Sequence, residues 1–252
     1  MKKIYIHLKG GLGNQLFQYA FYLNLINSGV VVDGFYETYK DDTYDRNLEI
    51  NKILKMPIET IDSINSESVI IQSEDLNAIL TFLESKNEGV FVLDGYFQQY
   101  EYVLNSKIEN YLNLNIDQIP MTALHIRRSD YGHHGLLPLT YYMHALNLVE
   151  NSDFYIFSDE FNFSNYFFSK VKGFKGVIKA RKETSVSDFC SMISFKNIIM
   201  ANSSYSWFAS YLSSVCSSSK IIYPSDWSLI DQSSPGFNLN WLKVKTKLNQ
   251  NW

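Results

Sequence analysis

The chain has 252 residues, 46% of them hydrophobic and 15% aromatic, so it can bury a substantial core and is too apolar to be disordered. Its formal net charge of −4, without an extended basic run, argues against nucleic acid as the main partner. The two cysteines, Cys190 and Cys216, are too few for a disulfide framework and lack metal-site spacing. No signal peptide or membrane helix stands out, which predicts a cytoplasmic protein that can associate peripherally with the inner membrane.

The amino-terminal residues predict a strand, a glycine-rich turn, a helix and a second strand, which is an α/β unit. The expected strands are residues 3–8 and 30–33, and the helix begins near residue 16. Gly11 and Gly13 lie in the turn, where glycine lets the backbone approach a ligand and the following helix favours an anion. These two glycines are therefore candidate ligand-binding positions.

Two interpretations of this turn compete. Gly11, Gly13 and the later Asp33 imitate a dinucleotide fingerprint, which would make the chain an NAD-dependent oxidoreductase. Leu16 occupies the place of the third glycine, and Asn14 adds a polar amide. A tight structural turn without a ligand explains the same residues.

The middle of the chain contains the predicted boundary between two domains. We expect loops and short helices over residues 37–67, lining an acceptor site, and a buried strand over 90–93. Helices are expected over 76–83 and 102–114, and a linker over 115–120. The predicted domains are therefore residues 1–118 and 119–252, with a carboxyl-terminal tail, helical or frayed, that packs back on the first domain.

The second half repeats a strand-then-helix rhythm, with polar clusters where strands end. The first cluster contains His125, Arg127, Arg128 and Asp130. The arginine fork suits phosphate oxygens, so two adjacent arginines suit a diphosphate. The alternative is a structural network in which the arginines pair with Asp130 and another carboxylate.

Two further strand exits are polar. Asp159 and Glu160 follow a strand expected over 154–157, and a run of small hydroxyl residues follows one over 197–201. Because ligands of parallel sheets bind at the carboxyl ends of strands, we expect these clusters to share one rim with the arginines. The remaining expected elements are helices over 138–150, 187–193 and 207–212 and strands at 177–178 and 221–227.

Five motifs occur together in the chain: GGLGNQLFQYA from residue 10, GYFQ from 95, HIRRSDY from 125, FSD from 157 and NSSYSW from 202. In this order the sequence resembles the bacterial α-1,2-fucosyltransferases, glycosyltransferase family 11. The resemblance spans nearly the whole chain. It implies a GT-B-like α/β fold of two Rossmann-type halves facing a central cleft, with GDP-L-fucose as the donor and no required metal.

The resemblance also implies roles for individual residues. Residues 119–252 would bind GDP-fucose and residues 1–118 the acceptor. Arg127 and Arg128 would bind the diphosphate, with His125 near the nucleotide. Asn14 would face the sugar from the first half. Phosphate donors at a helix start would be Ser203, Ser204 and Ser206.

The reaction implied is an inverting transfer of L-fucose to the 2-hydroxyl of a galactose-containing oligosaccharide or lipid-linked glycan. Arginine and amide donors would stabilise the charge on the departing GDP. Candidates for a general base are Asp130, Asp159 and Glu160, and Asp130 has orienting the arginines as its alternative role. After the oxidoreductase, a non-catalytic carbohydrate-binding module is the second functional alternative, since the aromatic content suits one.

Overall fold

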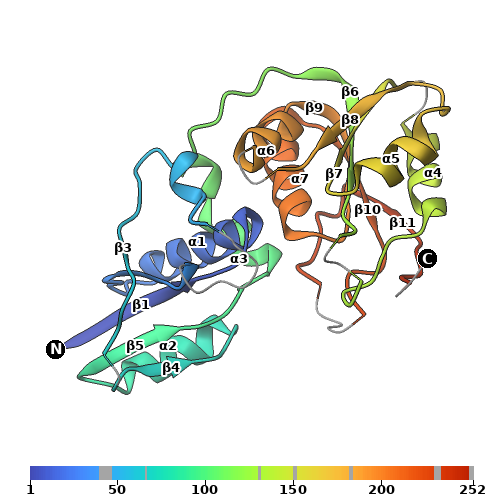
Figure 1. The fold of residues 1–252 in the computed structure, drawn as a ribbon. Coiled ribbons are helices and arrows are strands. Elements are labelled where there is room, and N and C mark those ends of the chain that lie inside the picture. Colours follow the sequence, from blue (N-terminus) through green and yellow to red (C-terminus); the bar gives the residue numbers. More distant parts are fainter. Residues whose placement is uncertain are drawn as a thin grey trace. The chain divides into compact units, whose positions relative to one another are not determined.

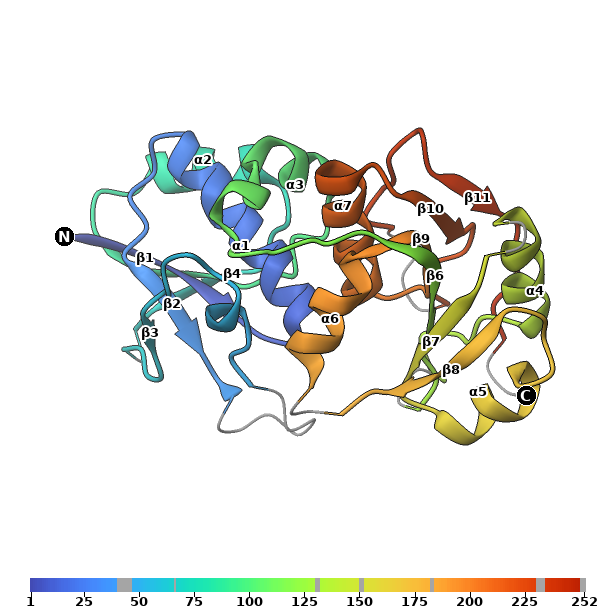
Figure 2. The ribbon, with the colours of Figure 1, turned by 90° about the horizontal axis from the view of Figure 1, so that it is seen from above.

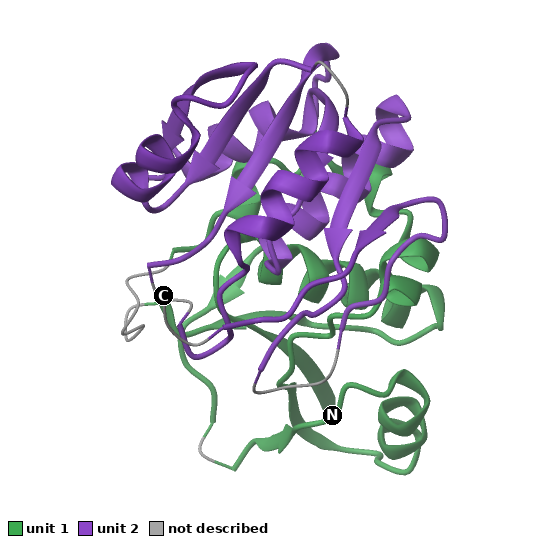
Figure 3. Cartoon of the chain, turned by 90° about the vertical axis from the view of Figure 1, so that its right-hand side faces the viewer, with its two compact units in different colours: residues 1–113 green, residues 114–252 purple. Residues whose placement is uncertain are grey.

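The computed structural model describes residues 1–39, 47–65, 67–129, 132–149, 152–181, 184–229 and 234–249. It divides into two compact units, residues 1–113 (unit 1) and 114–252 (unit 2), coloured separately in Figure 3. The division lies a few residues before the expected boundary between 118 and 119. Each unit contains one sheet whose strand pairs are all parallel, as an α/β fold requires.

Unit 1 contains a five-stranded sheet in the order β3-β2-β1-β5-β4. Its strands are β1 (Lys2–Leu8), β2 (Gly34–Glu37), β3 (Thr60–Ile61), β4 (Val69–Ile71) and β5 (Gly89–Leu93). Its helical elements are α1 (Leu12–Asn27), η2 (Ile50–Lys52), α2 (Leu76–Glu84), α3 (Tyr100–Ser106) and η3 (Ile108–Tyr111). β1 lies at the centre, so the glycine turn after it is held against the middle of the sheet.

The core of unit 1 forms around α1, which is apolar over most of its circumference and is therefore a buried helix. It packs against α3, and the rings of Phe21 and Phe97 stack at 3.9 Å between centroids. Phe97 has a left-handed backbone, with φ of 52°. This stacking fixes the segment after β5 against the helix that follows β1.

Three expectations for unit 1 need correction. The second strand is residues 34–37 instead of 30–33, because Asp33 bonds to Ile4 through its backbone amide and its carboxylate before pairing with β1 begins at Gly34. The helix expected over 102–114 ends early, at Lys107, whose φ of 52° breaks α3 from η3. The strands β3 and β4 were not expected, because runs of two and three residues are too short to show a strand pattern in the sequence.

Unit 2 contains a six-stranded sheet in the order β11-β10-β9-β6-β7-β8. Its strands are β6 (Ile119–Ile126), β7 (Phe154–Ser158), β8 (Phe174–Lys179), β9 (Phe195–Ile199), β10 (Lys220–Pro224) and β11 (Leu242–Val244). Its helices are α4 (Leu139–Leu148), α5 (Phe161–Phe168), α6 (Ser185–Ile193) and α7 (Ser204–Ser217). Read from β8 to β11, this is the 3-2-1-4-5-6 order of the dinucleotide-binding Rossmann fold.

Helices cover both faces of this sheet, with α4 and α5 on one side and α6 and α7 on the other (Figure 1). β6, β7 and β8 lie side by side, as Figure 2 shows from above. The strands of the central part are mostly buried on both faces, so they appear in the sequence as mainly apolar segments. A cluster of buried side chains, including Leu124, Tyr142 and Phe154, packs α4 against β6 and β7.

The tail corrects another expectation, since it is neither helical nor frayed up to residue 249. β11 pairs with β10, and Leu248 packs into the cluster under α4. Leu136 and Asn249 form a bridge, so the tail belongs to unit 2. Across the described ranges, no helix combines the length and apolar character needed to cross a membrane.

Candidate functional site

The sheet of unit 2 has a topological switch point between β6 and β9. After β6 the chain continues to β7 and β8 on one side, and then crosses to β9 on the other. Open parallel sheets bind ligands at such a point, outside the carboxyl ends of the strands. His125 and Arg127 lie at the end of β6, and Ser203 follows β9. The structure therefore brings together the first and third predicted clusters.

The second predicted cluster supports the first. Asp159 holds in place the loop after β6 that carries Arg127, Arg128 and Ser129, here called the arginine loop. Its Oδ1 accepts from the backbone amide of Arg128 at 2.9 Å, and its Oδ2 accepts from the amide and hydroxyl of Ser129 at 3.3 and 2.8 Å. Nη1 of Arg127 lies 3.1 Å from Oδ2. The structural ion pair weighed as the alternative thus forms for Arg127. With both oxygens engaged, Asp159 positions a loop.

Ser158 fixes the turn that presents Asp159. Its hydroxyl oxygen accepts from the amide of Glu160 at 3.0 Å and from the hydroxyl of Ser164 at 2.9 Å. Ser158 is buried and pairs in register with Ile126 at the end of β6. The carboxylate of Asp159 is therefore anchored opposite the arginine loop.

Arg128 is placed by stacking. Its guanidinium carbon lies 3.9 Å from the ring centroid of Phe163 on α5, which is a cation–π distance. This stacking fixes the plane of the guanidinium group. Burial lowers the pKa of Arg128, opposed by Tyr142, Glu160 and Asp159, yet a guanidinium stays charged in any such setting. The result is a half-buried cation with a fixed orientation at the switch point.

His125 is a neutral side chain. It is buried at the end of β6, and burial followed by the charge of Arg127 lowers its pKa to about 3. Its ring lies 5.6 Å from that of Tyr205 on α7, and within the described part of the chain its Nδ1 has no hydrogen-bond partner. His125 therefore offers a ligand a hydrogen bond and no charge.

The start of α7 contributes backbone donors. Ser203 is the N-cap, with an extended backbone, and its carbonyl accepts from the amide of Trp207 at 2.9 Å. The amides of the first helical turn have no intrahelical acceptor and favour an anion. Ser204 opens this turn, half-buried.

Ser206 and Asn202 of the NSSYS motif have structural partners. The hydroxyl of Ser206 donates towards the carbonyls of Ala201 and Ser203, at 3.2 and 3.4 Å, so its proton is used inside the turn instead of at a phosphate. The amide of Asn202 donates to the carbonyls of Gly135 and Trp227. These contacts fix the loop shape that places the start of α7.

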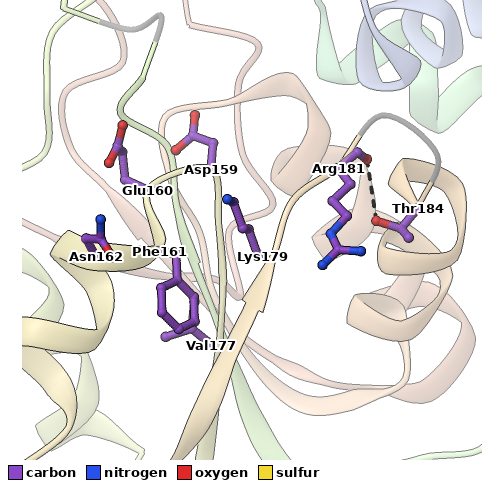
Figure 4. A pocket seen from close by; sticks show the side chains of 8 residues that line it. All are labelled: Asp159, Glu160, Phe161, Asn162, Val177, Lys179, Arg181 and Thr184. Carbon is purple, nitrogen blue, oxygen red and sulfur yellow. Dashed lines mark hydrogen bonds between the residues drawn. The ribbon is translucent and has the colours of Figure 1, made fainter.

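A pocket of about 580 Å³ opens beside the arginine loop, at the carboxyl ends of β7 and β8 (Figure 4). Asp159 lines the pocket and also contacts the arginine loop, whereas the arginines of that loop do not line the pocket. Acidic groups on one side face basic groups on the other. The lining residues are Asp159, Glu160, Phe161, Asn162, Val177, Lys179, Arg181 and Thr184. Lys179 and Arg181 are cations that the sequence did not single out.

The glycine turn of unit 1 is shaped for Asn14. Gly10 has a φ of +75°, and a Cβ there would lie 2.4 Å from Nδ2 of Asn14. Oδ1 of Asn14 accepts from Nε2 of Gln98 at 2.8 Å, which orients the amide. Gly11 caps α1 and Gly13 is buried in its first turn, so they permit close packing around Asn14.

The dinucleotide interpretation of this turn fails on Asp33. In that fold the acidic residue stands where the second strand ends, beside the ribose. Here Asp33 precedes β2 and bonds to the amide of Ile4 at 2.8 Å, at the opposite edge of the sheet. The oxidoreductase alternative is therefore not supported by this geometry.

A polar group at the carboxyl edge of the first sheet, made of His7, Lys9 and Asp94, was not predicted from the sequence. Nδ1 of His7 lies 2.9 Å from Oδ1 of Asp94, and Nζ of Lys9 lies 2.6 Å from the same oxygen. The available signal was a histidine near the end of an otherwise apolar strand and an aspartate at the exit of another. Their separation in sequence hides the contact.

One predicted site residue has no described position. Asp130, expected as a base or an orienting group, is outside the described residues. Among those that are described, no group of three or more His, Cys, Asp or Glu side chains is arranged to hold a metal ion.

No family model matches the chain. It is 27% identical to the O-antigen biosynthesis glycosyltransferase WbnK of Escherichia coli, over 83% of this chain and 90% of the relative. It is 26% identical to an α-1,2-colitosyltransferase of E. coli, over 84% and 88% of the two chains. Both matches span the two units.

Solved structures show the same fold. E. coli heptosyltransferase WaaC with ADP matches with a TM-score of 0.55 and 10% identity, covering 97% of this chain and 93% of that one. E. coli ADP-heptose LPS heptosyltransferase II matches with a TM-score of 0.51 and 11% identity, covering 96% and 90%. The fold is thus GT-B-like, as the sequence predicted. The chain is a glycosyltransferase, distantly homologous to bacterial enzymes of O-antigen biosynthesis.

Proposed function

We propose that the chain transfers L-fucose from GDP-L-fucose to the 2-hydroxyl of a galactoside, with inversion at the anomeric carbon. The observation that carries this proposal is the fixed guanidinium of Arg128 at the switch point of a Rossmann-ordered sheet. The motifs of the fucosyltransferases and the similarity to a protein named α-1,2-colitosyltransferase support a deoxyhexose and an α-1,2 linkage. WaaC, of like fold, was solved with ADP, a nucleoside diphosphate.

Arg128 binds the diphosphate together with the first-turn amides of α7, and Ser203 and Ser204 lie at the same helix start. Arg127 is held by Asp159 and adds a second positive charge. As the bond from the sugar to the β-phosphate breaks, GDP leaves with the electron pair. Preorganised donors stabilise that charge, and removing one such donor typically costs about 100- to 1,000-fold in rate.

The pocket at β7 and β8 takes the nucleoside. In Rossmann folds an acid at the end of the second strand binds the ribose, and Glu160 occupies that end of β7 and lines the pocket. His125 stays neutral and gives a hydrogen bond to the nucleotide. Asn14, oriented by Gln98, contacts the sugar.

A ligand panel tests the class of donor. Ligands that bind only the native state stabilise it by about 2.7 kcal/mol at 100 times their dissociation constant, which raises the melting temperature by several degrees. We expect GDP and GDP-fucose to raise it and NAD to leave it unchanged in a thermal-shift assay. A shift with NAD alone would support the oxidoreductase instead.

Colitose transfer is the second candidate, favoured by one relative. Colitose lacks the 3-hydroxyl of fucose, and a site built to bond that hydroxyl rejects the analogue without it. Competing GDP-fucose against GDP-colitose with a galactoside acceptor separates the two. Preferred transfer of fucose supports the proposal, whereas preferred transfer of colitose would make GDP-colitose the donor. Binding without any transfer or hydrolysis would indicate a carbohydrate-binding module.

A further inference from the structure

The sheet of unit 1 has a switch point of its own, between β1 and β5. The chain leaves β1 for β2 and β3 on one side, and β5 pairs with the other side of β1. The carboxyl ends of these two strands are where an open parallel sheet places ligand groups. His7 lies near the end of β1, and Asp94 follows the last residue of β5.

His7 and Asp94 form a partly accessible pair at this edge. Their side chains are 17% and 15% exposed, and Nδ1 lies 2.9 Å from Oδ1. Lys9 donates to the same carboxylate oxygen at 2.6 Å. Gln72 approaches the other oxygen, Oδ2, at 3.4 Å. Asp94 is therefore a carboxylate fixed by several donors, with the imidazole as one of them.

These contacts fix the tautomer of His7. An ionised carboxylate only accepts hydrogen bonds, so Nδ1 of His7 carries the proton that Asp94 accepts. In the neutral ring Nε2 then has a lone pair, and the hydroxyl of Thr38 lies 3.0 Å from it. The nitrogen that can take a proton, Nε2, therefore faces a hydroxyl group. A sugar hydroxyl is the same kind of donor as that of Thr38.

Burial favours the neutral form of the His7 ring. Burial lowers the pKa of His7 below its ordinary value; Asp94 and Glu37 oppose this, and Lys9 reinforces it. Burial would raise the pKa of Asp94, but the hydrogen bonds from Lys9 and His7 hold it below its ordinary value. A neutral imidazole beside a carboxylate can accept a proton and be stabilised as the cation.

We propose that His7 is the general base of the transfer, with Asp94 as its positioning residue. This inference rests on the proposed function. The acceptor hydroxyl replaces Thr38 at Nε2, its oxygen forms the bond to the anomeric carbon, and its proton passes to Nε2. The bond from the sugar to GDP breaks, and GDP departs with the electron pair.

Asp159, expected from the sequence as a base, suits this step less well than His7. Four donors already occupy its oxygens, and they belong to the arginine loop. His7, by contrast, has a nitrogen lone pair whose partner is an exchangeable hydroxyl. The base is therefore carried by the unit that the family resemblance assigns to the acceptor.

His7→Gln tests the proposal, with lactose as the galactoside probe and GDP-fucose as the donor. A general base contributes typically about 100- to 10,000-fold, so we expect kcat/KM to fall by that factor. In the wild type kcat/KM falls as pH drops through the lowered pKa of His7, and this acidic limb disappears in the variant. The thermal shift with GDP stays unchanged. His144→Gln, at an exposed histidine of α4, is the matched control and retains wild-type kinetics.

Asp94→Asn supplies a second measurement if His7→Gln destabilises the protein. It keeps the shape of the side chain and removes the charge, so the rate falls and the acidic limb moves to lower pH. An unchanged rate for His7→Gln, or a lost rate with the wild-type pH profile, overturns the role of His7. A wild-type protein that neither transfers fucose nor binds GDP overturns the proposed function, and the inference with it.

Discussion

Arg128→Ala lowers kcat/KM for transfer from GDP-fucose by about 100- to 1,000-fold, the usual cost of one preorganised donor to a developing negative charge. The guanidinium is held over Phe163 at 3.9 Å, which fixes the donor in place before the ligand binds. GDP affinity falls as well, because the diphosphate is charged in both the donor and the product. Steady-state kinetics and calorimetric titration with GDP measure the two effects.

Two further variants separate geometry from charge. Arg128→Lys keeps the charge and loses the planar fork, so its rate lies between wild type and Arg128→Ala. Lys196→Ala removes an exposed cation of β9 and serves as the control for net charge. Wild-type turnover in Arg128→Ala, with the fold intact, would show that the diphosphate is bound by other residues.

Gln15→Leu destabilises the protein by about 3–5 kcal/mol, because it leaves two buried backbone amides without partners, at about 1–3 kcal/mol each, and also removes two bonds to partly buried carbonyls. Nε2 of Gln15 donates to the carbonyls of Gly10 and Asn47 at 3.0 and 2.7 Å. Its Oε1 accepts from the amides of Glu49 and Ile50 at 2.9 and 3.0 Å. This glutamine of the glycine motif thus holds the turn to the η2 segment.

Urea denaturation measures that change, with Gln118→Leu, at an exposed position of unit 2, as the matched control. The control is expected to stay within about 0.5 kcal/mol of wild type, as surface changes do. A loss below about 1 kcal/mol for Gln15→Leu would mean that the four bonds are replaced by water. In that case Gln15 would be free for a direct role in the site.

The strands and helices of unit 2 were predictable because their side chains are buried on a regular period. β6, β7 and β9 are mainly apolar segments followed by polar residues, and those polar residues mark the carboxyl edge of the sheet. The position of Arg128 at this edge followed from that pattern. The edge strands β3, β4 and β11 were missed because each has only two or three residues, too few to show a strand pattern in the sequence.

The partners of the site residues were not predictable, because they are distant in sequence. Asp159 was expected as a base, but its partners lie in the loop after a different strand. Ser206 was expected to face a phosphate, but its hydroxyl is turned back by local bonds that only the loop shape reveals. His7 meets Asp94 across neighbouring strands, and spacing in one sequence carries no sign of that pairing.

A crystal structure with bound GDP tests the central claim most directly. We predict diphosphate oxygens within hydrogen-bond distance of the Arg128 guanidinium and of the first-turn amides of α7. The nucleoside is expected in the pocket that Glu160 lines. A nucleotide bound away from the carboxyl ends of β6 and β9, without contact to Arg128, would contradict it.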